Sequence, residues 1–243
     1  MPNPLSQPTT ILLTGATSGI GAALCARLLR QGHTVIALSR HAAHLPAQPG
    51  LIAINADLTD LPAIPALAQR LLAEHPALSI LINNAAVQHA HALADPNSTP
   101  ARLIEEAALN LAAPALLTQA LLPHLIARPA GAIVNLSSGL AIFPKEQGGL
   151  YSATKAGLSS FTTSLRWQAE TTPLLVSEVI LPLVDTPMTA GRGRGKITPD
   201  HAAQTILAGI TARRPIIRVG AARALPVIAA LAPWAGRRLL RGA

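Results

Sequence analysis

Apolar positions follow two patterns that alternate along the chain, short continuous runs and longer segments with helical spacing. Short runs rich in Ile, Leu and Val predict seven strands, at residues 9–14, 34–39, 51–55, 80–83, 132–137, 174–181 and 216–220. Longer segments with helical spacing of apolar residues predict helices between them, at residues 19–31, 63–74, 101–127, 151–170 and 199–212. The first five runs are apolar almost throughout, which is typical of strands buried on both faces. The alternation requires crossover connections and predicts an α/β fold with a doubly wound, mostly parallel, seven-stranded sheet.

The whole chain, residues 1–243, is expected to form a single domain. Half of the residues are apolar and only 12% are charged, which argues against disorder. No internal repeat or linker divides the sequence. A single cysteine, Cys25, excludes an internal disulfide and favours a reducing compartment. The N-terminus lacks the pattern of a signal peptide, and no apolar run reaches the ~20 residues of a membrane span, so we expect a cytoplasmic protein.

Positive charge gathers toward the C-terminus. The formal net charge is +8, and residues 191–243 contain ten of the 19 basic residues but one of the 11 acids. A basic segment at residues 221–243 can mark contact with nucleic acid or with an anionic membrane surface. It has no interleaved aromatic residues and matches no nucleic-acid-binding module, so we expect no nucleic-acid partner. We favour a solvated basic face over contact with a membrane surface.

A glycine-rich turn joins the first predicted strand to the first predicted helix. The segment reads "TGATSGIGAAL", with Gly15, Gly19 and Gly21 at the junction. Glycines allow a tight turn and a close approach of the backbone to phosphate, and the helix N-terminus presents free N–H groups. The spacing G-x-x-x-G-x-G is also compatible with a simple tight turn. Its position at the first strand–helix junction favours nucleotide binding and a Rossmann-type sheet.

The ends of the next strands indicate which dinucleotide is bound. The second strand ends in Ser39 and Arg40, without the carboxylate that would bind a free ribose 2′-hydroxyl. Arg40 can pair with a 2′-phosphate, so we favour NADP(H), with NAD(H) as the alternative; a surface arginine is the simpler interpretation of the residue alone. Asp57 and Leu58 follow the third strand and are expected near the adenine.

Tyr151 and Lys155 lie four residues apart in "GLYSATKAGL", so they share one face of a helix. Ser138 ends the fifth strand, thirteen residues before Tyr151, and Asn110 lies within an Ala- and Leu-rich helix. Each residue alone has an ordinary structural explanation. Asn110 is the hardest to explain in this way, because a polar residue on an apolar face needs hydrogen-bond partners.

Together, "TGATSGIG", "NNAA", Asn110, Ser138 and "YSATK" resemble the short-chain dehydrogenase/reductase family, in its order and spacing over nearly the whole chain. The segments "SSGLA", "LPLVDT" and "GRGRGK" are similar to a bacterial branch named for its association with D-alanine esterification of teichoic acid. The resemblance implies the catalytic residues Asn110, Ser138, Tyr151 and Lys155. It implies cofactor contacts from Gly15, Thr17, Ser18, Gly19, Ile20, Gly21, Ser39, Arg40, Asp57, Leu58, Asn84, Ala85, Ala86, Tyr151, Lys155, Pro182, Val184 and Thr186.

These residue types suit proton transfer to a reduced carbonyl. A free tyrosine has a pKa of about 10, and an adjacent ammonium such as that of Lys155 lowers it. The resemblance also implies that Lys155 binds the nicotinamide ribose and that Asn110 holds a water linking Lys155 to solvent. Ser138 would stabilise charge on the substrate oxygen. We prefer Ser138 to Ser137 on the family's spacing to the tyrosine.

Two positions depart from the family pattern. Leu183 follows Pro182 where glycine is usual in the family, and "NNAA" ends in Ala86 where glycine is also usual. Residues 187–198, "PMTAGRGRGKIT", are expected to form a mobile substrate lid, with a disordered basic loop as the alternative. The histidines of "HAHALADP" suit substrate contact or solvent better than a metal, so no metal site is expected.

We therefore expect an NADP(H)-dependent oxidoreductase that interconverts a small-molecule carbonyl and alcohol. The alternative is a dinucleotide-binding scaffold or regulator with little turnover. The resemblance implies a homodimer or homotetramer.

Overall fold

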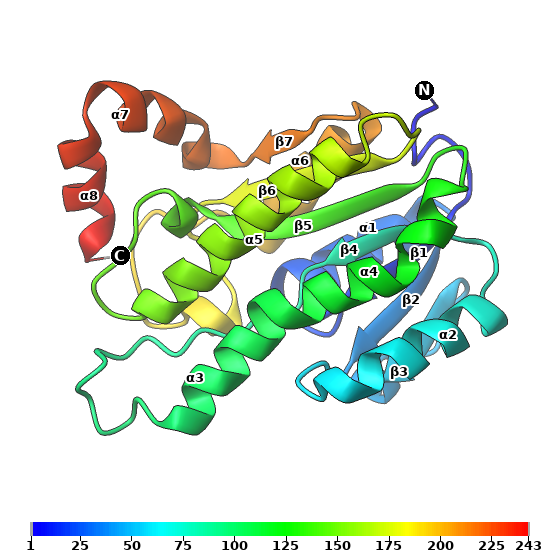
Figure 1. Cartoon of the computed structure of the whole chain (residues 1–243), viewed down its shortest axis with the longest axis horizontal. Coiled ribbons are helices and arrows are strands. Elements are labelled where there is room, and N and C mark those ends of the chain that lie inside the picture. Colours follow the sequence, from blue (N-terminus) through cyan, green and yellow to red (C-terminus); the bar gives the residue numbers. More distant parts are fainter. Residues whose placement is uncertain (1, 243) are drawn as a thin grey trace.

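A computed structural model describes residues 2–242 of the chain. Its sheet has the strand order β3-β2-β1-β4-β5-β6-β7, and every pairing is parallel (Figure 1). The strands are β1 (Thr10–Thr14), β2 (Thr34–Ser39), β3 (Leu51–Asn55), β4 (Leu78–Asn83), β5 (Ala132–Ser138), β6 (Leu175–Leu181) and β7 (Ile216–Arg218). The predicted doubly wound seven-stranded sheet is confirmed, with strand ends within two residues of the expected positions.

Helices cover both faces of the sheet, as crossover connections require. The helices are α1 (Gly19–Arg30), α2 (Ile64–Glu74), α3 (Pro100–Ala107), α4 (Ala113–Ile126), α5 (Gly149–Gln168), α6 (Pro199–Thr211), α7 (Leu225–Leu231) and α8 (Pro233–Arg241). One core lies beneath α1 and α6, where Leu24, Leu28 and Ile206 pack on the sheet. The second core lies beneath α2, α4 and α5, on the face toward the viewer in Figure 1.

The predicted helix at residues 101–127 is one continuous helical segment with a π-helical turn, Ala108–Ala112, between α3 and α4. The hydroxyl of Thr99 accepts a hydrogen bond from the backbone N–H of Arg102, and Pro100 is the first residue of the helix. A π-helical turn inserts one residue and changes the direction of the side chains that follow. Asn110 lies within this turn and is fully buried.

The segment Pro100–Ile126 is long and apolar enough to cross a membrane by length and composition. This corrects the expectation that no segment of the chain reaches that length. Its second half lies along the sheet, with Leu117, Leu121 and Leu125 buried in the second core. The same test is passed by core helices of soluble proteins, so the observation is weak evidence for a membrane span.

A chain of buried polar side chains ties α5 to the centre of the sheet. Asn83 Nδ2 donates to Asn135 Oδ1 over 2.8 Å, and Asn135 Nδ2 donates to Thr162 Oγ1 over 2.8 Å. The Thr162 hydroxyl in turn donates to the carbonyl of Leu158. Asn83, Asn135 and Thr162 are all buried away from water, so they must form their hydrogen bonds with one another and with the backbone. The network fixes the helix that carries Tyr151 relative to β4 and β5.

We predict that Asn135→Ala lowers the free energy of unfolding by about 2–4 kcal/mol, because it removes the oxygen that accepts from the Asn83 amide and the amide that donates to the Thr162 hydroxyl in the core. Urea denaturation followed by circular dichroism measures this change. Exposed Asn97→Ala provides the control and should cost less than about 1 kcal/mol. A similarly small loss for Asn135→Ala would show that the network does not hold α5.

Candidate active site

The glycine turn lies at the carboxyl end of β1, where α1 begins. Gly15 has a φ of 68°, in the left-handed region that glycine tolerates. A Cβ on Gly21 would lie 2.0 Å from the Gly15 carbonyl oxygen, so the two segments approach too closely for any side chain. The resulting concave turn exposes the N-terminus of α1 to the groove above it, which is the arrangement that binds phosphate.

The predicted "NNAA" segment holds this turn in shape. Asn84 Nδ2 donates to the carbonyls of Thr14 and Gly15, over 2.9 and 3.0 Å. The Thr14 hydroxyl accepts from the backbone N–H groups of Asn84 and Ala85. These contacts join the carboxyl ends of β1 and β4, which are neighbours in the sheet although far apart in sequence. Asn84 therefore shapes the floor of the groove through its hydrogen bonds.

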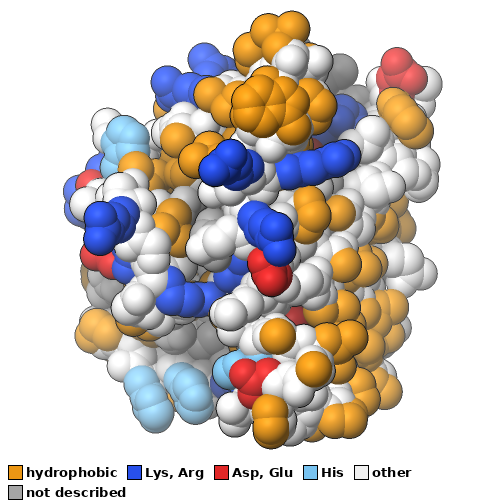
Figure 2. All heavy atoms as spheres, turned by 90° about the vertical axis from the view of Figure 1, so that its left-hand side faces the viewer, with side chains coloured by type: hydrophobic (Ala, Val, Ile, Leu, Met, Phe, Trp, Pro, Cys, Tyr) orange, Lys and Arg blue, Asp and Glu red, His pale blue; other side chains and the backbone are white. Residues whose placement is uncertain are grey.

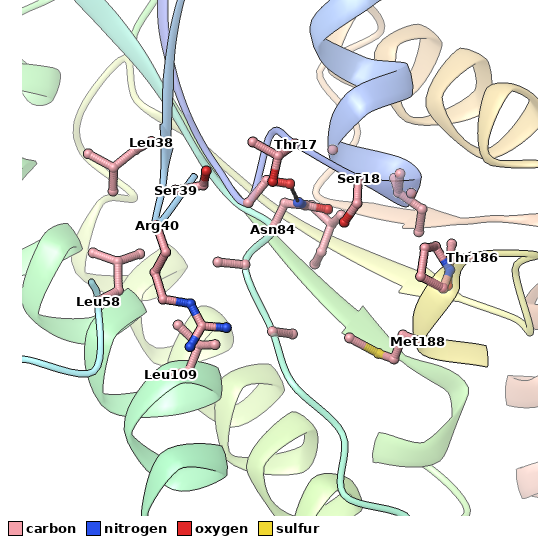
Figure 3. Close-up of a pocket in the computed structure, with 18 of the residues that line it drawn as sticks. Thr17, Ser18, Leu38, Ser39, Arg40, Leu58, Asn84, Leu109, Thr186 and Met188 are labelled. Atoms are coloured by element: carbon pink, nitrogen blue, oxygen red, sulfur yellow. Dashed lines mark hydrogen bonds between the residues drawn. The ribbon is translucent and has the colours of Figure 1, made fainter. Parts of the chain in front are cut away.

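A groove of about 340 Å³ runs across the carboxyl ends of the strands from the glycine turn to Tyr151 and Lys155 (Figure 3). Its walls contain every residue predicted to bind the cofactor except two, Pro182 and Val184. Val184 is buried and pairs with Ile197 in an isolated parallel bridge. Residues that the sequence did not indicate also line the groove: Leu38, His41, Ala56, Leu109, Leu136, Ser137, Leu181, Pro187 and Met188.

Arg40 extends from the end of β2 across one end of the groove, between Leu58 and Leu109 (Figure 3). Its Nη1 lies 3.5 Å from Oε1 of Glu105 in α3. Arg40 therefore has an acidic partner in Glu105, although no carboxylate follows β2 directly. Asp57 turns the other way, and its Oδ1 accepts from the backbone N–H and the hydroxyl of Thr59, which lowers the pKa of this carboxyl group.

Tyr151 and Lys155 lie one turn apart near the start of α5, on the groove side of the helix. Lys155 Nζ is 5.7 Å from the centre of the Tyr151 ring and donates to the carbonyl of Leu136 over 2.9 Å. Lys155 is buried, and a buried ammonium needs such acceptors in place of water. The expected pairing of the two residues on one helix face is present, and β5 supplies the carbonyl that holds the lysine.

Burial sets the charges of this pair. Burial lowers the pKa of Lys155 to about 8, because an ammonium is less stable away from water. Burial and the carboxylate of Glu106 together raise the pKa of Tyr151 to about 12, although the guanidinium of Arg192 opposes them. The expectation that Lys155 lowers the pKa of the tyrosine is therefore wrong for the protein without cofactor. Desolvation is the largest cause of the raised Tyr151 pKa, and Lys155 is not among the charges that move it.

The other two predicted catalytic residues, Ser138 and Asn110, form hydrogen bonds with backbone groups. Ser138 Oγ accepts from the N–H of Leu140 over 3.1 Å, which leaves its own hydrogen available. Asn110 pairs with Val87 in both directions, since its Oδ1 accepts from the Val87 N–H and its Nδ2 donates to the Val87 carbonyl. Asn110 Nδ2 also donates to Thr154. Asn110 therefore attaches the loop after β4 to α5, and its role in holding a water stays a prediction.

Two buried charged residues near the tyrosine were missed by the sequence analysis. Glu106, in α3, is buried and accepts a hydrogen bond from the backbone N–H of His89. Lys145, before α5, is also buried, and its pKa is lowered first by burial and then by Arg192. Neither residue belongs to a recognisable motif. The single signal in the sequence is that Glu106 falls at an apolar position of its helix.

The histidines after β4 lie beside carboxylate side chains. His89 Nε2 lies 3.0 Å from Glu105 Oε2, and His91 Nδ1 lies 3.6 Å from Asp95 Oδ2. Within residues 2–242, no group of three or more His, Cys, Asp or Glu side chains is placed to hold a metal ion.

The sequence matches the family model described as short chain dehydrogenase over residues 9–196. The chain belongs to this family.

Relatives and solved structures agree with the assignment. This short-chain dehydrogenase is 37% identical to "Uncharacterized oxidoreductase DltE" of Bacillus subtilis (strain 168) over 183 residues, which are 73% of this chain and 72% of that protein. Its fold superposes with a TM-score of 0.86 on a short chain dehydrogenase from Burkholderia cenocepacia J2315 solved with NADP, at 25% identity and over 96% and 98% of the two chains. A short-chain dehydrogenase from Sphingobium yanoikuyae solved with NADPH gives a TM-score of 0.79, at 27% identity and over 93% and 94%.

Leu183, one of the two residues that depart from the family pattern, packs against the predicted lid of this short-chain dehydrogenase. A Cβ on Gly193 would lie 2.2 Å from Leu183 Cδ2, so Leu183 fills the space that the glycine leaves. Lys196 Nζ donates to the Thr189 carbonyl over 2.7 Å, and Arg192 Nη2 donates to the carbonyl of Met188. The segment at residues 187–198 is thus hydrogen-bonded to itself and to its own base, and its assignment as a mobile lid stays a prediction.

We predict that the buried ammonium costs stability below pH 8. Because the pKa of Lys155 is about 8 when folded and 10.5 ordinarily, the unfolded chain binds more protons between these pH values. The wild type should therefore gain about 3 kcal/mol relative to Lys155→Met between pH 7 and pH 10.5. Urea denaturation of both proteins across this range measures the gain. Lys196→Met, at a partly exposed lysine, controls for the loss of a charge, and an equal gain relative to this variant would contradict the prediction.

Proposed function

We propose that this short-chain dehydrogenase reduces a small-molecule carbonyl with NADPH, and that Tyr151 donates the proton. The observation that carries the proposal is that the half-buried Tyr151 and the buried Lys155 line one end of a groove whose other end is the glycine turn. An elongated groove with a phosphate-binding turn at one end and a proton donor at the other suits a dinucleotide that reaches between them. The two NADP(H)-bound relatives described above support the choice of cofactor.

The residues present fit this cofactor. Gly15 and Gly21 have no room for a side chain, and the turn between them leaves the N–H groups at the start of α1 to receive a pyrophosphate. Arg40 lies in the groove wall near Leu58 (Figure 3), and we assign its guanidinium to the 2′-phosphate of the cofactor. When bound, the nicotinamide supplies the hydride.

The chain's own residues then handle one proton and one developing charge. With a pKa of about 12, the Tyr151 phenol is fully protonated at neutral pH. An alkoxide is a stronger base than a phenolate, so it takes the proton of Tyr151 as it forms. The Ser138 hydroxyl accepts a hydrogen bond from the Leu140 N–H, which leaves its own hydrogen free to donate. We assign this hydrogen to the substrate oxygen. Lys155 offers its remaining N–H groups and a positive charge that stabilises the phenolate left behind.

The raised pKa favours carbonyl reduction over alcohol oxidation, because oxidation requires the phenolate at the start of the reaction. We further propose that residues 187–198 close over the substrate, with Arg192 approaching the phenol as the lid closes. The competing function is a dinucleotide-binding scaffold with little turnover. A Tyr151 pKa that stays at about 12 when the cofactor binds would favour this scaffold function.

We predict that Tyr151→Phe lowers kcat for carbonyl reduction by about 10²- to 10⁴-fold, the usual contribution of a general acid, and leaves the Kd for NADPH within about threefold. NADPH consumption with a panel of aliphatic and aromatic aldehydes and ketones measures turnover, and fluorescence titration measures binding. Ser152→Ala, on the same helix, tests for general disturbance of α5. Turnover by Tyr151→Phe at the wild-type rate would contradict the assigned role. NADPH binding without turnover of any compound by the wild type would favour the scaffold.

We predict opposite effects on cofactor affinity from the two residues that pair across the groove. Arg40→Gln should weaken NADPH binding by about 10- to 100-fold and leave NADH binding nearly unchanged, because only NADPH carries the 2′-phosphate. Glu105→Gln should strengthen NADPH binding, since it removes the carboxylate that competes for Arg40. Titrations of both variants with both cofactors measure the effects. Equal losses of NADPH and NADH affinity in Arg40→Gln would show that Arg40 does not read the phosphate.

A further inference from the structure

Helices α7 and α8 present large apolar side chains to solvent. The exposed fractions are 59% for Val227, 80% for Leu231, 71% for Trp234 and 66% for Leu239. Figure 2 shows apolar side chains gathered on this end of the molecule, with Lys and Arg side chains beside them. Single exposed apolar residues are ordinary, but four large ones on two adjoining helices form a patch that marks an interaction site.

The way α8 attaches to the domain turns this patch outward. Gly236 faces Phe143, and a Cβ on the glycine would lie 2.3 Å from the phenylalanine ring. The helix thus packs on the domain through Gly236 and Leu240, and Trp234 and Leu239 do not take part in this contact. Arg241 Nε donates to Glu146 Oε2 over 2.8 Å, and the Arg241 carbonyl accepts from the N–H of Glu146. These contacts hold α8 with Trp234 and Leu239 exposed.

The charge around the patch has one sign. Residues 221–242 contain Arg223, Arg237, Arg238 and Arg241 and no acidic residue. All four arginines are exposed, and only Arg241 forms an ion pair within the described residues. A hydrophobic surface surrounded by cations is complementary to a surface that is apolar within and anionic outside. We name the set Val227, Leu231, Trp234, Leu239, Arg223, Arg237 and Arg238 the α7–α8 surface.

We propose that the α7–α8 surface docks on an anionic lipid bilayer. Trp and Leu side chains of a basic amphipathic helix insert at the boundary between headgroups and acyl chains, while its arginines meet anionic headgroups. A bilayer accounts for both components of the surface, and a nucleic acid would account for the arginines alone. Docking goes beyond the proposed reaction and does not depend on it.

Docking would place the active site beside the membrane. Helices α7 and α8 lie beyond the ends of β5, β6 and β7, at the same end of the molecule as the loop that contains residues 187–198 (Figure 1). The entrance to the substrate site would therefore face the headgroup region. The sequence alone favours a solvated basic face over contact with a membrane. The exposed apolar residues of α7 and α8 reverse this preference, because a solvated face does not need them.

Co-sedimentation of the full chain with vesicles tests the proposal. One set of vesicles is pure phosphatidylcholine, and the other contains one-third phosphatidylglycerol. We expect binding to the anionic vesicles only, and its loss at high salt. Arg237→Gln/Arg238→Gln should weaken the partition by about 25-fold, at about fivefold for each arginine. Arg30→Gln/Arg70→Gln removes the same charge from α1 and α2 and should change binding less than about twofold.

Tryptophan fluorescence tests insertion separately from charge. The chain has two tryptophans, so Trp167→Phe leaves Trp234 as the single reporter. Its emission should shift to the blue when anionic vesicles are added, while a Trp234→Phe protein, which reports from Trp167 on α5, should show no shift. Trp234→Ala should weaken sedimentation in parallel.

Four results would overturn the proposal: no binding to anionic vesicles, equal loss in the two double-arginine variants, an unshifted Trp234, or self-association of the protein that disappears in Trp234→Ala. The last result would identify a second copy of the chain as the occupant. An unchanged Kd for NADPH in each variant confirms that the domain is folded, and it separates failure of docking from failure of the proposed reaction.

Discussion

The parallel pairing of β1 with β4 brings together two strand ends that are about seventy residues apart in sequence, and the site depends on this junction. The order of the strands reverses there, so the crossover helices leave on opposite faces and open a groove above the sheet. Thr14 and Asn84 join the two ends by hydrogen bonds, the glycine turn leaves from one of them, and the loop bound by Asn110 leaves from the other. β5 and α5 extend the same edge to Tyr151.

Burial is the second constraint, and it explains why the tyrosine and lysine behave differently from free side chains. Removing water favours the neutral form of both groups, so their pKa values move apart, to about 12 and about 8. The buried carboxylate of Glu106 strengthens the effect on the phenol. The protein therefore holds a protonated tyrosine beside an ammonium that is easily neutralised. A cationic group brought into the groove would be needed to reverse the effect on the phenol.

Much of the fold follows from local patterns, whereas the charged surroundings of the site do not. The apolar runs of the first five strands predict the sheet because strands buried on both faces must be apolar, and the glycine turn follows from local sequence. The burial of Glu106 and Lys145, and the pairing of Arg40 with Glu105, depend on segments that approach only in the folded chain. Helices α7 and α8 were missed because prolines interrupt "ALPVIAALAPWAG" and because its apolar residues face solvent. Pro182 and Val184, expected from the family pattern, lie outside the groove walls.

The most direct test of the account is the ionisation of Tyr151, which is the single tyrosine of the chain. Labelling tyrosine with ¹³C at Cζ gives one resonance that reports the phenol alone. Without cofactor, the account predicts no ionisation up to about pH 10, because the pKa is about 12. With NADP⁺ bound, the positive charge of the nicotinamide should lower that pKa by about two units or more. Ionisation of Tyr151 below about pH 10 in the protein without cofactor would contradict the claim that the site keeps this phenol protonated as the donor of the reaction.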